Sequence, residues 1–124
     1  MASFLSRMAG RLARSPEQVD AEELSLHCAA LGTTHISAVP NREVVEVSGE
    51  LRSLTLPPRS TVPTLTAELY DGTGTMTLVW LGRREIPGIS PGVRLRVRGR
   101  ATYRKGSPTI FNPQYQILPR HHGD

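Results

Sequence analysis

The chain has 124 residues, with 15 Lys and Arg against 11 Asp and Glu, and a single cysteine. This length fits one domain and excludes two domains of ordinary size. The single cysteine excludes an internal disulfide, and no apolar run reaches the length of a membrane-spanning helix.

The formal net charge of +4 is unevenly distributed along the chain. Residues 83–120 carry nine Lys or Arg and one acid, whereas residues 1–82 carry six Arg and nine acids. A positive field concentrated in one part of a chain attracts polyanions. The charge pattern therefore favours a partner with phosphate groups or an acidic surface.

The first fifteen residues are basic, contain no acid and are amphipathic. Phe4, Leu5, Met8 and Leu12 recur at helical spacing, which predicts a short helix. An organelle transit peptide has the same character and is the alternative interpretation.

A second helix is expected to follow Ser15 and Pro16, since this pair is typical of one helix ending and another beginning. Asp20 and Glu23 have the spacing of a capping box. The buried face of this helix is marked by Leu24, Cys28 and Leu31.

Cys28 is expected to be an inert buried thiol on that face. Gly32 is expected to end the second helix. Residues 33–41 contain a proline and are interpreted as a connector.

From Arg42 onward the apolar residues recur with a period of two, which is typical of half-buried strands. The first strand alternates from Val45 to Leu51 and is expected to continue towards Leu56 past a bulge. The second and third strands cover residues 65–70 and 75–81. A tight turn with two glycines joins them.

Residues 93–103 alternate apolar and arginine side chains and predict the fourth strand. The fifth covers residues 109–118, with an edge or bulge at Pro113. Residues 82–92 hold two prolines and three glycines and are expected to form a loop.

Five strands, with a glycine near the middle of the first, predict a mainly β fold: a five-stranded Greek-key barrel with an N-terminal helical extension. The expected divisions are a helical extension and connector over 1–41, the barrel over 42–118 and a flexible tail over 119–124.

Several motifs in the barrel region resemble the OB-fold nucleic-acid-binding domains of the tRNA-anticodon-binding type. They are Val-Ser-Gly-Glu-Leu at 47–51, Glu-Leu-Tyr-Asp-Gly-Thr-Gly at 68–74, Leu-Val-Trp-Leu-Gly at 78–82 and Val-Arg-Gly-Arg at 97–100. Residues 106–118 look like the end of the wedge domain of the RecG branch-migration helicase. The whole chain looks like the short stand-alone OB-fold proteins of actinobacteria. The resemblance implies a five-stranded barrel that binds single-stranded or junction nucleic acid.

Four arginines alternate with apolar residues along the fourth strand and are expected on its outer face: Arg94, Arg96, Arg98 and Arg100. Their pitch of about 6.7 Å is comparable to the spacing of phosphates in an extended strand, so this face could follow a nucleic-acid backbone. The alternative is a solvated surface in which Glu46, Glu50 and Glu68 pair with the arginines.

The aromatic residues of the barrel region are expected in three kinds of position. Tyr70 and Tyr115 are the candidates for stacking on bases, because their hydroxyl groups tolerate exposure. Trp80 and Phe111 are expected in the core, and Tyr103 is expected at one end of the barrel.

Further basic residues are expected on loops that flank the barrel. The full candidate nucleic-acid site comprises Arg52, Arg59, Tyr70, Arg83, Arg84, Arg94, Arg96, Arg98, Arg100, Arg104, Lys105 and Tyr115.

No catalytic site, metal site or cofactor is expected. Asp71 is assigned to turn chemistry, and His27 and His35 lack a second ligand at metal spacing. The pair His121 and His122 is assigned to the tail.

We therefore expect a cytoplasmic, non-enzymatic protein that binds single-stranded DNA or RNA and no membrane. The alternative function is a protein-interaction or assembly module. In that case the barrel is a scaffold, and residues 1–31 dock on a protein partner or a second copy.

Overall fold

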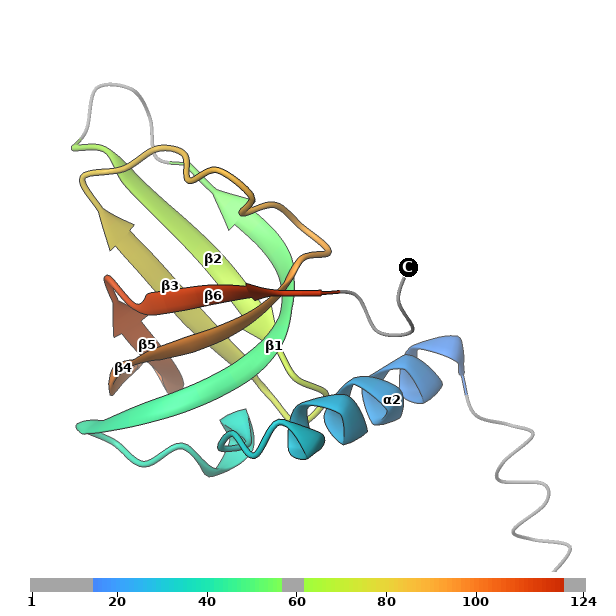
Figure 1. The fold of residues 1–124 in the computed structure, drawn as a ribbon. Coiled ribbons are helices and arrows are strands. Elements are labelled where there is room, and N and C mark those ends of the chain that lie inside the picture. The colour runs from blue at the N-terminus through green and yellow to red at the C-terminus, as the bar shows by residue number, and fades with distance from the viewer. Residues whose placement is uncertain (1–14, 57–61, 120–124) are drawn as a thin grey trace, which may run out of the picture.

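In the computed structural model, residues 15–56 and 62–119 are described. They form a mainly β structure: a closed five-stranded barrel, one extra strand and one α-helix that precedes the barrel (Figure 1). The elements in chain order are α2 (Pro16–Ala30), the 3-10 helix η1 (Ile36–Ala38), β1 (Glu43–Thr55), β2 (Thr64–Tyr70), β3 (Thr75–Leu81), β4 (Arg94–Arg104), β5 (Ser107–Phe111) and β6 (Gln114–Leu118). This architecture confirms the predicted fold class.

The long strand β1 closes the barrel, because its first half pairs with β4 and its second half pairs with β2. Glu50 belongs to both pairings. The register shifts between Leu51 and Ser53, which confirms the predicted bulge. At Gly49 a Cβ atom would lie 2.7 Å from the carbonyl oxygen of Tyr70, so a side chain has no room where β1 bends. The glycine therefore permits the closure.

The predicted fifth strand is divided into β5 and β6 at Asn112 and Pro113. Asn112 has a φ of 50°, which interrupts the extended backbone. β5 pairs in parallel with β3 and antiparallel with β4, whereas β6 pairs with β4 alone. β5 begins at Ser107, two residues before the expected position.

Apolar residues from two connecting segments complete the barrel core. Ile36 and Val39 come from η1 and the residue after it, and Ile86 and Ile89 come from the loop between β3 and β4. Figure 1 shows these two segments at opposite ends of the barrel. Residues 33–41 thus connect α2 to β1 and also supply core residues, which the sequence did not indicate, since an isolated pair of apolar residues has no periodicity that reveals burial.

α2 begins at Pro16, and Ser15 is its N-cap. The Ser15 Oγ accepts from the Gln18 N–H at 3.2 Å, and Gln18 Oε1 accepts from the Ser15 N–H at 2.9 Å. This pair is the capping box, so the assignment to Asp20 and Glu23 was wrong; those two residues lie inside the helix. The expected end of α2 is confirmed by Gly32, which follows the C-cap with a φ of 74°.

The predicted helix over 1–14, the candidate Arg59, and His121 and His122 lie outside the described residues. Within the described ranges, no helix is long and apolar enough to cross a membrane.

Candidate nucleic-acid interface

The arginine row lies on the outer face of β4, as its alternation predicts. Leu95, Val97 and Ala101 are buried in the core, and the arginines between them are exposed or half-buried on the opposite side. Backbone pairing places β1 along one side of this row and β6 along the other.

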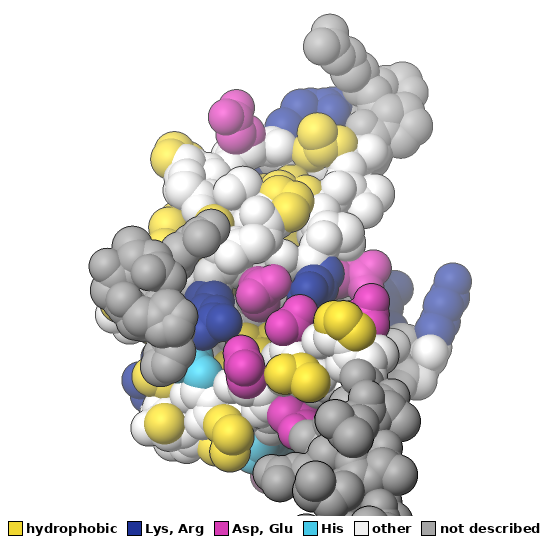
Figure 2. Space-filling model, turned by 90° about the vertical axis from the view of Figure 1, so that its right-hand side faces the viewer, with side chains coloured by type: hydrophobic (Ala, Val, Ile, Leu, Met, Phe, Trp, Pro, Cys, Tyr) yellow, Lys and Arg dark blue, Asp and Glu magenta, His cyan; other side chains and the backbone are white. Residues whose placement is uncertain are grey.

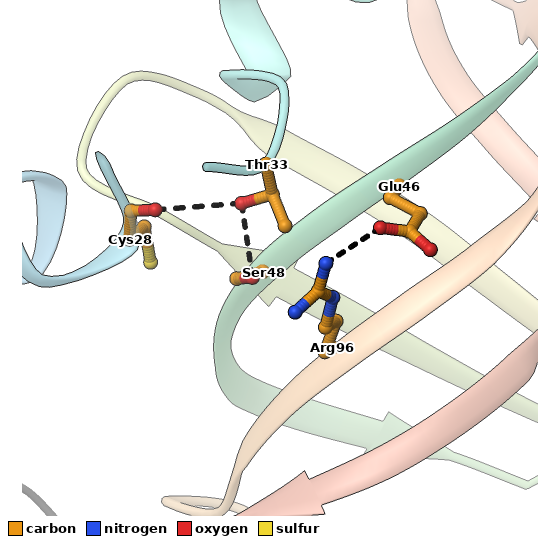
Figure 3. A network of polar contacts seen from close by, with 5 residues as sticks. All are labelled: Cys28, Thr33, Glu46, Ser48 and Arg96. Carbon is orange, nitrogen blue, oxygen red and sulfur yellow. Dashed lines mark hydrogen bonds and ion pairs between the residues drawn. The ribbon is translucent and has the colours of Figure 1, made fainter. Parts of the chain in front are cut away.

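Carboxylates on β1 pair with the first half of the row. Arg96 Nη2 donates to Glu46 Oε2 at 2.7 Å, and Arg94 Nε lies 3.8 Å from Glu50 Oε2 (Figure 3 shows the Arg96–Glu46 pair). Arg52 Nη1 also lies 3.5 Å from Glu50 Oε1. On the face that carries α2, Figure 2 shows acidic side chains gathered around the basic ones. This half of the row therefore resembles the paired surface that the sequence left open as an alternative.

The pKa of Glu46 records the strength of that pairing. The hydrogen bond from Arg96 and the positive charge of Arg96 hold the pKa of the Glu46 carboxyl below its usual value, with a smaller contribution from Arg98. Glu46 is therefore ionised at neutral pH and offsets positive charge at the centre of the row.

The second half of the row is more open. Arg98 and Arg100 are exposed, and the Arg100 guanidinium donates to the carbonyl oxygen of Arg42 at 2.7 Å. Arg104 and Lys105 follow at the turn into β5, where Lys105 has a φ of 52°. None of these four residues has an ion-pair partner within 4.0 Å among the described residues.

Phe111 lies beside this open half, with 39% of its surface exposed. The expectation that Phe111 is a core residue was therefore wrong. Pro108, Thr109 and Ile110 of β5 are buried, whereas Phe111 at the end of the strand is exposed. The Arg104 guanidinium lies 5.2 Å from the centre of the Phe111 ring, within cation–π range.

An uncharged face extends from Phe111 across two neighbouring strands. Phe111 is paired in register with Val79 of β3, which is in turn paired with Thr66 of β2. Leu81, 52% exposed, ends the same face of β3. Glu68, two residues along β2 from Thr66, bounds the uncharged face, and its Oε1 accepts from the Ser53 hydroxyl at 3.4 Å.

The two tyrosines predicted to stack on bases lie in different places. The Arg52 guanidinium covers the Tyr70 ring at 4.9 Å, and both residues line a cavity of about 320 Å³ with Glu17 and Asp20 of α2. Tyr115 lies on β6 and meets Trp80 edge to face, with 6.0 Å between ring centres.

Two other aromatic predictions are confirmed. Trp80 is buried in the core. Tyr103 lies at one end of the barrel, where its hydroxyl donates to the Val39 carbonyl oxygen at 2.6 Å.

The loop after β3 carries the remaining candidates, Arg83 and Arg84. Arg83 is exposed and Arg84 is half-buried. They follow Leu81, the last residue of β3, after Gly82. They therefore lie near the end of the uncharged face where β3 ends.

The sequence and the fold were compared with known proteins. The family model described as the OB-fold nucleic acid binding domain, of the tRNA anti-codon type, matches residues 45–118, which is more than half of the chain. The chain belongs to this family. The match confirms the resemblance drawn from the strand motifs.

Solved structures agree on the OB fold at low sequence identity. The p204 HINb domain superposes with a TM-score of 0.57 at 20% identity, over 73% of this chain and 49% of that one. A structure described as "Structural mimicry for functional antagonism" superposes with a TM-score of 0.54 at 12% identity, over 68% and 44%. This OB-fold chain thus spans about half the length of each neighbour. A search among curated proteins finds no match.

In OB folds, ligands commonly bind across the second and third strands and between the loops that follow the first and fourth. In this OB fold those elements are the uncharged face of β2 and β3, residues 56–63, and the turn with Arg104 and Lys105. Phe111 and Arg104 therefore lie beside the usual binding surface. Sequence reasoning missed Phe111 because a short apolar segment does not show which of its side chains point outward.

Asp71 has a structural role, as its position in the turn predicts. Its buried carboxylate accepts from the Ile36 N–H at 2.8 Å and from the Thr73 hydroxyl at 2.6 Å. No group of three or more His, Cys, Asp or Glu suited to a metal occurs among the residues described for this OB fold.

Proposed function

We propose that this OB fold binds single-stranded DNA or RNA across the outer face of β3 and β5 and along the open half of β4. One observation carries the proposal: an exposed aromatic ring, Phe111, lies between an uncharged sheet face and a row of cations without described ion-pair partners. Single-strand binders combine such rings, on which bases stack, with basic grooves that follow the phosphates.

The proposed roles follow from this placement. Phe111 is the platform for a base, with Arg104 on its ring. Phosphate contacts are assigned to Arg98, Arg100, Arg104, Lys105 and Arg83, and Arg84 stays a prediction as a further contact. A single strand fits this arrangement better than a duplex, because paired bases are stacked inside the double helix and do not reach an exposed ring.

The paired arginines have a lesser role in this proposal. Arg52, Arg94 and Arg96 would contact a phosphate only after exchanging a carboxylate partner, so we expect each to contribute less than Arg98. Arg59, Tyr70 and Tyr115 stay predictions as further contacts. The proposal describes a binding module rather than an enzyme; a cytoplasmic location also stays a prediction.

Fluorescence anisotropy with labelled single-stranded and duplex oligonucleotides tests this function. With about three to five phosphate contacts, log affinity for single strands should fall against log salt with a slope near −2 to −3.5. Absence of binding at low salt, or preference for the duplex, would contradict the proposal.

Variants locate the site. Phe111→Ala should weaken single-strand binding by about 1–3 kcal/mol, or roughly 5-fold to 150-fold, because one stacked base is lost. Leu26→Ala, at a residue of α2 that is 73% exposed, is the control and should bind as the wild type does. Replacing Arg104 and Lys105 with Ala should reduce the salt slope by about 1.4, whereas replacing Arg94 and Arg96 should change it less. If the two double substitutions reduce the salt slope equally, the binding site lies closer to α2 than we propose.

A further inference from the structure

β6 differs from the other strands in its surroundings. It pairs with β4 on one side, and no described strand pairs with its other side. Each of the other five strands contains buried residues, whereas every residue of β6 is exposed or half-buried. The strand is thus an open edge of the sheet (it lies at the front of the barrel in Figure 1).

This edge lacks the usual protection against pairing with another strand. Natural edge strands are protected by charged side chains, prolines or bulges. From Gln114 to Leu118, β6 contains none of these, and its sequence is Gln-Tyr-Gln-Ile-Leu. Pro113 and Pro119 stand just outside the strand, so the five residues between them keep their backbone N–H groups.

Apolar side chains accompany the open backbone. Tyr115 and Ile117 lie on one side of β6, opposite Val97 and Leu95 of β4, yet they are 42% and 44% exposed. Gly88 lies close to the end of the Ile117 side chain, which keeps 44% of its surface exposed. A strand added beside β6 would satisfy the edge backbone groups and cover both side chains.

We propose that two copies of this chain pair through antiparallel β6 strands, related by a two-fold axis at Gln116. In this register Tyr115 of each copy lies opposite Ile117 of the other, an aromatic–aliphatic pair that stabilises antiparallel sheets. The two Gln116 amides meet at the axis, where each can donate to the other. An interface of this kind is self-complementary, as a two-fold dimer requires.

Charge permits a second copy as the occupant. Each copy carries a net charge of +4, so a self-interface must avoid opposing like charges. β6 brings none to the axis, and the neighbouring Arg94 and Arg96 of β4 are already paired with Glu50 and Glu46. The exposed Arg98 lies beside Gln114, at the end of β6 and away from the axis. The edge is therefore a place where two basic molecules can meet without strong repulsion.

The interface is small, since five residues of each copy pair. Interfaces of this size lie at the weak end of the range for specific association. We therefore expect a reversible monomer–dimer equilibrium that depends on protein concentration rather than a permanent dimer.

Sedimentation velocity of the full chain tests the proposal, from low micromolar to near-millimolar concentration. The wild type should shift from monomer to dimer as concentration rises. Gln116→Lys places two ammonium groups opposite each other at the axis and should weaken dimerisation at least about tenfold. Leu26→Lys, at an exposed residue of α2, should dimerise as the wild type does. Circular dichroism confirms that each variant is folded.

Mixing two charge variants of Gln116 distinguishes pairing at the β6 edge from a general effect of the added charge on association. Fluorescently labelled Gln116→Lys protein should form dimers again when unlabelled Gln116→Glu protein is added, because opposite charges then meet at the axis. A wild type that stays monomeric throughout would overturn the proposal. Gln116→Lys protein that dimerises normally, or a mixture in which the labelled protein stays monomeric, would also overturn it.

Discussion

Asp71 connects two distant parts of the chain through one buried carboxylate. Its Oδ1 accepts from the N–H groups of Thr73 and Gly74 at 2.8 Å and 3.1 Å, and its Oδ2 accepts from the N–H of Ile36 at 2.8 Å. The turn after β2 is thereby joined to η1, which fills one end of the barrel. The sequence predicted the turn that contains Asp71, but not the hydrogen bond to Ile36, which is 35 positions away.

We expect Asp71→Ala to lower the free energy of unfolding by about 2–4 kcal/mol, because several buried donors lose a charged acceptor. Urea denaturation measures this loss. Glu68→Ala, at an exposed carboxylate of the same strand, should change stability by about 0.5 kcal/mol or less. A loss of that small size for Asp71→Ala would show that the turn and η1 are held by other contacts.

The arginine row shows the same limit on residue-scale prediction. Alternation in β4 was enough to place all four side chains outside, because strand geometry is local. Their partners depend on the register between β1 and β4, and Arg96 and Glu46 are 50 positions apart. The sequence therefore left two interpretations open, and the structure shows pairing for Arg94 and Arg96.

At the scale of elements, α2 packs on β1 through a small polar network. The Thr33 hydroxyl, just after the helix, lies within hydrogen-bond distance of Ser48 Oγ, at 3.0 Å, and of the Cys28 carbonyl oxygen, at 3.5 Å (Figure 3). Burial, with the nearby Asp71 carboxylate, raises the pKa of the Cys28 thiol to about 11. The prediction of an inert thiol is thus supported, since the thiolate is the reactive form.

Cys28 should therefore report on the separation of α2 from the barrel. At pH 8 its thiolate is roughly a hundred-fold rarer than for a thiol of pKa 9.0, so a disulfide reagent should react slowly with folded protein. Thr33→Val should accelerate the reaction by removing the bonds beside the helix end. Full reactivity in urea is the control. Rapid wild-type reaction at pH 8 under native conditions would contradict the burial of this helix face.

Elements with regular periods were predictable to within a few residues, and short segments were not. β1 to β4 follow from alternation, and the break at Asn112 follows from the proline after it. η1 is three residues long and has no period to detect. Phe111 was misplaced because apolar character alone does not give the phase of a five-residue strand.

At the scale of the whole molecule, closure depends on the bend of β1. Gly49 allows the backbone of Tyr70 to approach, so Gly49→Val should force β1 and β2 apart and lower the free energy of unfolding by about 1–3 kcal/mol. Thermal and urea denaturation measure the change. Ser53→Val, on a half-exposed position of the same strand, is the control and should be nearly neutral. An unchanged stability for Gly49→Val would mean that the barrel opens at this point without cost.

The two ends of the barrel are filled by segments from different parts of the chain. This difference decides which fragments of the protein can fold. Ile36 and Val39 precede the first strand, outside the 45–118 span that the family model matches. A fragment trimmed to that span would expose the apolar interior to water at one mouth. Such a fragment should aggregate or unfold. A fragment that starts at Ser15 keeps Ile36 and Val39, which close that end of the core.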